Sequence, residues 1–238
     1  MKLGTYAHIS ISVQSLKTTG VFYQTLGFRQ LWEHTDPKPW SLATDGRVNI
    51  HLYESDFPSP ALHYFSARMD DIARELRRSG VPLEHQKSKD GSRRQHTLYD
   101  PSEFAVMLMH HDDDDMPKPS GESNSVLGTF GELSINTGSL KNSLAYWQKL
   151  DFVRQQTSDN PYPWAILSDG VMTIGLHQTE SFTSPALTYF SPDIGEKLGE
   201  LERRSIPFTH MVSQSGEPEG AIVNAPDGQL FLLLKGDA

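Results

Sequence analysis

His8, His51 and His63 each stand on a segment in which polar and apolar residues alternate, as they do in a strand with one buried face. This alternation sets His8 opposite Ile9 and His51 opposite Ile50. Neutral imidazoles held on rigid strands suit zinc, iron(II), nickel or manganese. The chain contains no cysteine, so any metal would have to be bound through nitrogen and oxygen.

A single histidine on a strand is more often a hydrogen-bonded surface or core residue than a metal ligand. The metal interpretation therefore requires that several imidazoles from separate strands converge on one surface. The same doubt applies to the run of two histidines and four aspartates that follows Met109, where solvated side chains are the more common outcome.

Composition narrows the classes of partner. The chain of 238 residues has 30 acidic and 21 basic side chains and a formal charge of −9, which argues against nucleic-acid binding. Its first residues turn polar too soon for a secretory signal, and no apolar run approaches the length of a membrane span. We therefore expect a cytoplasmic protein whose partner is a small molecule rather than a nucleic acid or a membrane.

The sequence contains an internal repeat of about half its length. The stretch from Gly4 to Phe28 returns as the stretch from Gly128 to Phe152, with Glu132 in the place of His8. Two domains of about 110 residues each are large enough to form their own cores.

The predicted domains are 1–112 and 127–238, joined by a linker over 113–126. The linker is charged and rich in proline, glycine and serine, so we expect it to bury no apolar surface.

Each half reads as two units of one strand, one helix and three strands, which makes the fold class α+β. Ser15 can cap the first helix and Gly27 can end it, while Asp45 and Gly46 signal a hairpin turn. For the first half the predicted strands are 4–13, 28–34, 40–44, 48–54, 61–67, 83–87, 95–99 and 104–110, and the predicted helices are 16–26 and 70–79.

This four-unit pattern, with the run Phe22 to Phe28 closing the first helix and the run from Asp100 to Leu108 at the end of the half, resembles the vicinal-oxygen-chelate superfamily. That superfamily includes glyoxalase I, extradiol dioxygenases and bleomycin-resistance proteins. The resemblance implies two eight-stranded open-barrel (cup) domains. It also implies a divalent metal held by the first and last strands of each unit.

In the first half those four positions fall on His8, His51, His63 and Met107. Metal-binding members carry a glutamate where Met107 stands, and a thioether is soft, uncharged and no general base. The resemblance thus implies a centre of three histidines for zinc, iron, nickel or manganese. The missing carboxylate argues against a glyoxalase I reaction in particular.

Proton transfer in such a centre would need a further group, and Tyr53 or Glu33 are the candidates. In the second half the corresponding positions hold Glu132, Gly175, Thr188 and Leu232. One possible ligand does not hold a catalytic metal. We therefore expect a structural half, or a metal-free cup lined by Glu132, Ser134, Asn136 and His177.

Two functions from different classes follow. The first is a metal-dependent lyase, isomerase or dioxygenase acting on a small substrate with vicinal oxygens in the first cup. The alternative is a metal-free protein that binds or sequesters a small molecule, similar to bleomycin-resistance members. Trp40 and Trp164 recur at one repeat position, where packing is more usual than stacking on a ligand. His85 and His210 also recur, and the sequence assigns them no function.

Overall fold

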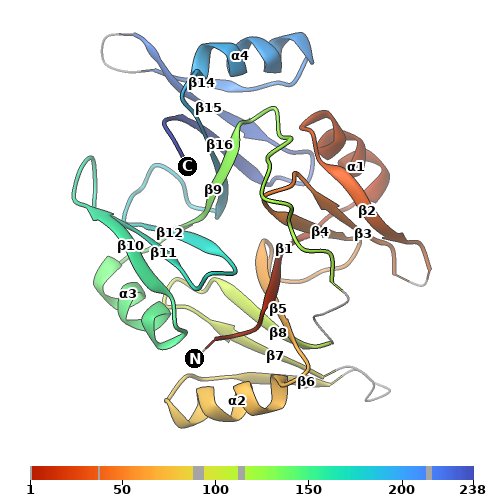
Figure 1. Cartoon of the computed structure of the whole chain (residues 1–238), viewed down its shortest axis with the longest axis vertical. Helices are drawn as coiled ribbons and strands as arrows, with labels where there is room; N and C mark the ends of the chain where they lie inside the picture. The colour runs from red at the N-terminus through yellow and green to blue at the C-terminus, as the bar shows by residue number, and fades with distance from the viewer. Residues whose placement is uncertain (1, 37, 88–93, 112–115, 213–215) are drawn as a thin grey trace. The chain divides into compact units, whose positions relative to one another are not determined.

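The computed structural model describes residues 2–36, 38–87, 94–111, 116–212 and 216–238. Within these ranges the chain forms two mixed sheets of eight strands and four helices of ten residues (Figure 1). None of these helices has the length and apolar character that crossing a membrane requires.

The first sheet has the hydrogen-bonded order β2-β3-β4-β1-β5-β8-β7-β6. Its strands and the two helices between them are β1 (Tyr6–Ser12), α1 (Leu16–Thr25), β2 (Arg29–His34), β3 (Trp40–Thr44), β4 (Asn49–Tyr53), β5 (Ala61–Ser66), α2 (Met69–Arg78), β6 (Glu84–Lys87), β7 (Arg94–Tyr99) and β8 (Ala105–His110).

The second sheet repeats the order as β10-β11-β12-β9-β13-β16-β15-β14. Its elements are β9 (Thr129–Asn136), α3 (Leu140–Lys149), β10 (Val153–Ser158), β11 (Trp164–Ser168), β12 (Thr173–His177), β13 (Ala186–Ser191), α4 (Ile194–Arg203), β14 (Thr209–Val212), β15 (Pro218–Asn224) and β16 (Leu230–Lys235). The prediction of an α+β fold with four strand-helix-strand-strand-strand units is confirmed, and both sheets are open rather than closed barrels.

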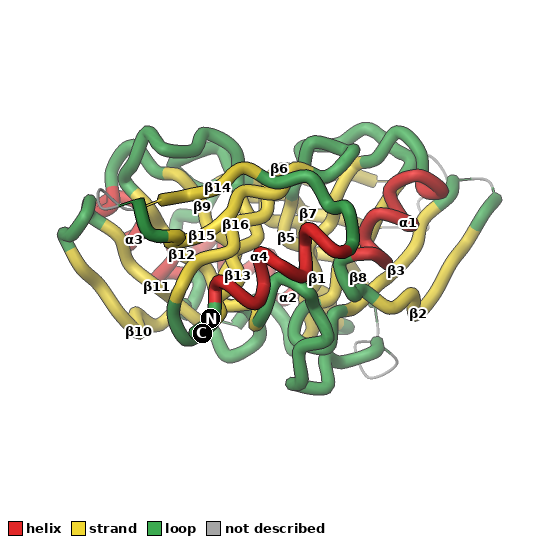
Figure 2. The backbone as a smooth tube through the Cα atoms, turned by 90° about the horizontal axis from the view of Figure 1, so that it is seen from above, coloured by secondary structure: helices red, strands yellow, loops and turns green. Residues whose placement is uncertain are grey.

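Each sheet joins two consecutive strand-helix-strand-strand-strand repeats through the first strand of each repeat. In the first sheet β1 runs antiparallel to β5, and His8 pairs with His63 in register. In the second sheet β9 runs antiparallel to β13, with a bulge beside Thr188. Figure 2 shows that strands, in yellow, make up more of the chain than helices, in red.

Local signals explain why the elements begin and end where they do. Ser15 and Ser139 accept bonds from the backbone N–H groups three residues on, which caps α1 and α3. Gly27 ends α1 with φ of 98°, and Asp151 takes the same left-handed conformation after α3 with φ of 65°. The helix ends are therefore equivalent although only one of them uses glycine.

Contacts divide the chain into two compact units, each of which draws segments from both halves of the sequence. Unit 1 comprises 1–10, 58–118 and 135–183, and unit 2 comprises 11–57, 119–134 and 184–238.

In unit 1 the hydroxyl of Tyr64 donates to Asp169 at 2.6 Å. In unit 2 the hydroxyl of Tyr189 donates to Asp45 at 2.8 Å. These four residues are all buried, and they occupy equivalent positions of the repeat. Burial raises the pKa of Asp45 and of both tyrosines, because each charged form is poorly solvated there.

The predicted linker does bury apolar surface, which corrects the sequence interpretation. Met116 is 9% exposed and packs in a cluster with Tyr6 and Phe65, while Val126 is 3% exposed. Backbone N–H groups of the segment donate to the carbonyls of Leu26, Asp45 and Gly46. The hairpin turn and the end of α1 thus supply partners that composition could not reveal. Residues 113–115 of the predicted linker lie outside the described ranges.

Candidate functional site

His8 and His63 face each other across the β1–β5 pair in unit 1. Their ring centroids are 5.4 Å apart and the planes are tilted by 39°. His8 is fully buried and His63 is 6% exposed. Burial lowers the pKa of His63 to about 3, so its imidazole is neutral at neutral pH, as a metal ligand must be.

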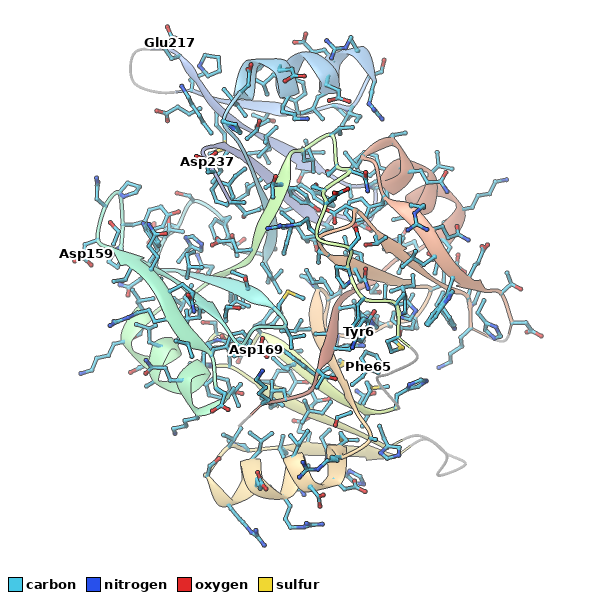
Figure 3. All side chains as sticks on the ribbon, viewed as in Figure 1. Tyr6, Phe65, Asp159, Asp169, Glu217 and Asp237 are labelled. Atoms are coloured by element: carbon cyan, nitrogen blue, oxygen red, sulfur yellow. The ribbon has the colours of Figure 1, made fainter. Side chains whose placement is uncertain are left out.

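Aromatic and apolar side chains surround this pair. The Phe65 ring lies 4.9 Å from that of His8, and the Tyr6 ring lies 5.8 Å from it. Figure 3 shows the labelled Tyr6 and Phe65 side chains next to each other. Together with Met116 they form an apolar cluster, which Met109 joins. The neighbourhood of His8 is therefore largely apolar.

Met107 lies directly opposite His63 on the parallel neighbour β8. Its sulfur accepts a hydrogen bond from Nε2 of Gln95 at 3.4 Å. The fourth position of the expected metal set is thus a thioether that already receives a donor. Neither β5 nor β8 contains an aspartate or glutamate that could supply the missing carboxylate.

His51 belongs to unit 2, where it stands on β4 among aromatic rings. Its Nδ1 lies 2.8 Å from the hydroxyl of Tyr53, and the two rings stack with centroids 3.9 Å apart. Trp40, directly opposite Tyr53 on β3, lies 4.7 Å from His51 with its plane nearly perpendicular. The predicted Tyr53 is thus in direct contact with the predicted ligand His51.

A continuous row of rings extends from this contact. His34 stacks on Trp40 at 5.8 Å, and Phe57 meets Tyr53 edge-on at 5.8 Å. We call these residues the aromatic wall: His34, Trp40, His51, Tyr53 and Phe57. His51 is buried, whereas the other four are partly or fully exposed. Sequence patterns indicated Trp40, His51 and Tyr53 separately and missed their contact with His34 and Phe57, although the alternation through β3 and β4 carries part of the signal.

Glu33 lies elsewhere on the first sheet. It is exposed on the edge strand β2 and accepts a hydrogen bond from Nε2 of Gln30 at 2.9 Å. Its partner across the strand pair is Ser41, whereas His34 pairs with Trp40. Because neighbouring strand residues alternate between faces, Glu33 points to the face opposite the aromatic wall.

The residues can be tested against the divalent metal that the sequence resemblance implies. Rings that bind one zinc ion through bonds of about 2.0–2.1 Å have centroids roughly 5–6 Å apart, so the His8–His63 pair fits two coordination positions. Across the described residues, however, no group of three histidine, aspartate or glutamate side chains is placed to hold a metal ion. The pair fits a metal in spacing, but the described donors do not complete a catalytic centre.

The second half carries a buried polar network in place of histidines. Ser134 donates to Glu132 at 2.6 Å, and the hydroxyl of Thr188 lies 2.6 Å from that of Ser134. Since Ser134 has one proton, which it donates to Glu132, Thr188 donates to Ser134. These three residues belong to unit 2.

The other two residues of the predicted second cup belong to unit 1. Asn136 donates to the carbonyls of Thr179 and Phe182. The ring of His177 lies 5.9 Å from that of Tyr162 and 5.7 Å from that of Phe182. Part of the aromatic arrangement at β3 and β4 is thus repeated at β12.

Comparison with solved structures identifies the architecture. A catechol 2,3-dioxygenase superposes with a TM-score of 0.65 at 14% identity, covering 100% of this chain and 89% of that chain. The 2,3-dioxygenase LapB from Pseudomonas sp. KL28 gives 0.63 at 12% identity, covering 97% and 91%.

A third structure, 2,2',3-trihydroxybiphenyl 1,2-dioxygenase from Sphingomonas wittichii strain RW1, gives 0.59 at 15% identity, covering 99% and 90%. This chain has the fold of the extradiol dioxygenases. At such identities the likeness is one of fold alone. No protein-family model matches the sequence, and no curated protein matches it either.

Proposed function

We propose that this protein binds a small aromatic compound against the aromatic wall of unit 2. The supporting observation is the unbroken contact of five rings from His34 to Phe57, with centroid separations between 3.9 and 5.8 Å. Partly exposed rings that are already fixed by their neighbours offer stacking and edge-on contacts at little entropic cost. An aromatic ligand can make both kinds of contact.

The wall also has a polar feature. The Tyr53 hydroxyl and Nδ1 of His51 form one hydrogen-bonded pair, and the phenol can both donate and accept. A hydroxyl group on the ligand would therefore find a partner in the wall. The solved structures that share the fold are named for catechol and for a trihydroxybiphenyl, which are aromatic compounds with hydroxyl groups. We propose the same ligand class here.

Binding of catechol provides the test, measured by isothermal titration calorimetry. Trp40→Ala removes the ring that contacts both His34 and His51, and it should weaken catechol binding at least tenfold. Tyr99→Ala removes a partly exposed ring on β7 in unit 1 and should leave binding unchanged. Equal affinities of wild type and Trp40→Ala would refute the proposal.

Tyr53→Phe separates the polar contact from the stacking. This variant keeps the ring but loses the hydroxyl that contacts His51, so catechol should bind several-fold more weakly while benzene binds as before. If both ligands weaken equally, the hydroxyl does not recognise the ligand's oxygen.

A second candidate is a metal-dependent lyase, isomerase or dioxygenase, and the observation that favours it is the facing pair of His8 and His63. In this proposal His8 and His63 would hold zinc, iron, nickel or manganese, whereas the predicted ligand His51 and the predicted proton-transfer groups Tyr53 and Glu33 belong to unit 2 and take no part in it. The bound cation would supply charge stabilisation to neighbouring substrate oxygens. The tilt and burial of the two rings would fix their orientation.

Metal analysis distinguishes the two candidates. Protein purified without chelator should contain about one equivalent of metal if the second candidate holds, and His63→Ala should lose it. The aromatic-wall proposal predicts catechol binding that survives treatment with a chelator. Equal metal contents in wild type and His63→Ala would exclude His63 as a ligand.

A further inference from the structure

Two histidines that neither candidate function uses meet on the β6–β7 hairpin in unit 1. His85 lies directly opposite His96 in the antiparallel register. Their Nδ1 atoms are 3.2 Å apart and their ring centroids 4.6 Å apart. Two nitrogen ligands at about 2.0–2.1 Å from one tetrahedral zinc ion lie roughly 3.3 Å from each other, so the nitrogen spacing already suits a shared metal.

The surroundings of His96 support the same geometry. His96 is 3% exposed, so neighbouring atoms fix the orientation of its ring, whereas His85 is exposed to solvent. Asp70, in the first turn of α2, lies 3.9 Å from Nε2 of His96. A carboxylate on the far nitrogen of an imidazole favours the proton there and leaves Nδ1 as a lone-pair donor.

We propose that His85 and His96 together bind a divalent transition-metal ion such as zinc, nickel or copper. Because His85 is exposed, water molecules would occupy the remaining coordination positions. In the described ranges no third histidine, aspartate or glutamate is placed to complete this group. The site is therefore an open two-imidazole site rather than a closed structural one.

Two features bear on the strength of the site. Metal ions require a neutral imidazole, and burial lowers the pKa of His96 below its usual 6.5, with further lowering by His85 and Arg77. Arg77 opposes binding directly, because its guanidinium donates a hydrogen bond of 3.4 Å to Nδ1 of His96 and so occupies the lone pair that a metal would need. Arg77 is exposed at the end of α2, so an arriving cation must displace its side chain.

The second half provides an internal control. His210 on β14 stands in the place of His85, but the residue opposite it on β15 is Ala221. The repeat therefore carries one imidazole at this position where the first half carries two. A single imidazole binds divalent metals far more weakly than a chelating pair.

Isothermal titration calorimetry with zinc tests the proposal on the intact chain. Wild type should bind one equivalent of zinc at this site. His85→Ala should lower the affinity of that site at least tenfold, and His96→Gln should do the same. His210→Ala should leave the titration unchanged. His85 is exposed, so its replacement leaves folding intact even if that of the buried His96 does not.

The sign of the Arg77 effect makes the test sharper. Arg77→Met removes the competing cation and should tighten zinc binding several-fold, whereas a general loss of structure would weaken it. Zinc affinity that is equal in wild type and His85→Ala would overturn the proposal. These outcomes leave the aromatic wall untouched, since the wall belongs to unit 2.

Discussion

His63 gives unit 1 a pH dependence of known sign. Its pKa is about 3 in the folded protein, against an ordinary value of 6.5, because burial disfavours the imidazolium. Between these values the unfolded chain binds a proton that the folded chain does not, so stability falls as the pH is lowered from 6.5 towards 3. The slope from this one group is at most about 1.4 kcal/mol per pH unit.

His63→Gln should remove this contribution, and the measurement is urea unfolding at several pH values between 4 and 7. The difference in unfolding free energy between wild type and variant should shrink steadily as the pH falls. A difference that stays constant over this pH range would mean that the folded and unfolded chains bind this proton equally.

The buried tyrosine–aspartate pairs make a second prediction at the residue scale. Tyr64→Phe removes the donor to Asp169 and leaves a buried carboxylate oxygen without that partner, at a cost of about 1–3 kcal/mol. Tyr189→Phe does the same to Asp45. Urea unfolding should show similar losses for both variants, and a loss below about 0.5 kcal/mol would contradict the assigned role.

Among the elements, the β3–β4 turn combines backbone conformation with a close approach. Gly46 has φ of 94°, and a Cβ atom there would overlap the carbonyl oxygen of Glu122. Gly170 occupies the equivalent turn with φ of 83°, yet the nearest atom to its added Cβ is the flexible end of Lys2. The main difference between the two glycines is the backbone of Glu122, which packs against Gly46 alone.

Both Gly46→Ala and Gly170→Ala should lose about 1 kcal/mol from the left-handed backbone. Gly46→Ala should lose roughly 1–3 kcal/mol more, because the segment from Gly121 to Asn124 must move away from the turn. Urea unfolding measures both losses, and limited proteolysis should cut this segment faster in Gly46→Ala alone. Equal losses would show that the segment is not held by the turn.

The sequence predicted most of these elements, because strand alternation, Ser15, Gly27 and the Asp45–Gly46 signal are local. The sequence did not predict that residues 119–126 are hydrogen-bonded to the rest of the chain. Their partners lie at the end of α1 and just after β3, which are remote in sequence. The same distinction applies to the candidate site. Alternation placed His51 and Tyr53 on one face of β4, but ring contacts across β2, β3 and β4 depend on strand register.

For the whole molecule, the domain boundaries at 112 and 127 remain a prediction. The compact units follow other boundaries, because each unit contains segments from both halves of the sequence. Unit 1 combines 58–118 with 135–183, and the buried bond from Trp147 to Asp100 at 3.1 Å lies within it. Burial raises the pKa of Asp100, so its carboxylate depends on partners such as this indole for its stability. Either half of the chain alone lacks some of these partners.

Separate expression of 1–126 and 127–238 tests this dependence. Each fragment should unfold at lower urea concentration than the intact chain and should bind apolar dyes, since it exposes core residues such as Trp147 or Tyr64. Mixing the fragments should restore one cooperative transition, because the interrupted core is then rebuilt from both. Two fragments that each unfold cooperatively at the midpoint of the intact chain would show that the halves are self-sufficient domains. In that case the tyrosine–aspartate bonds between halves would contribute little to either core.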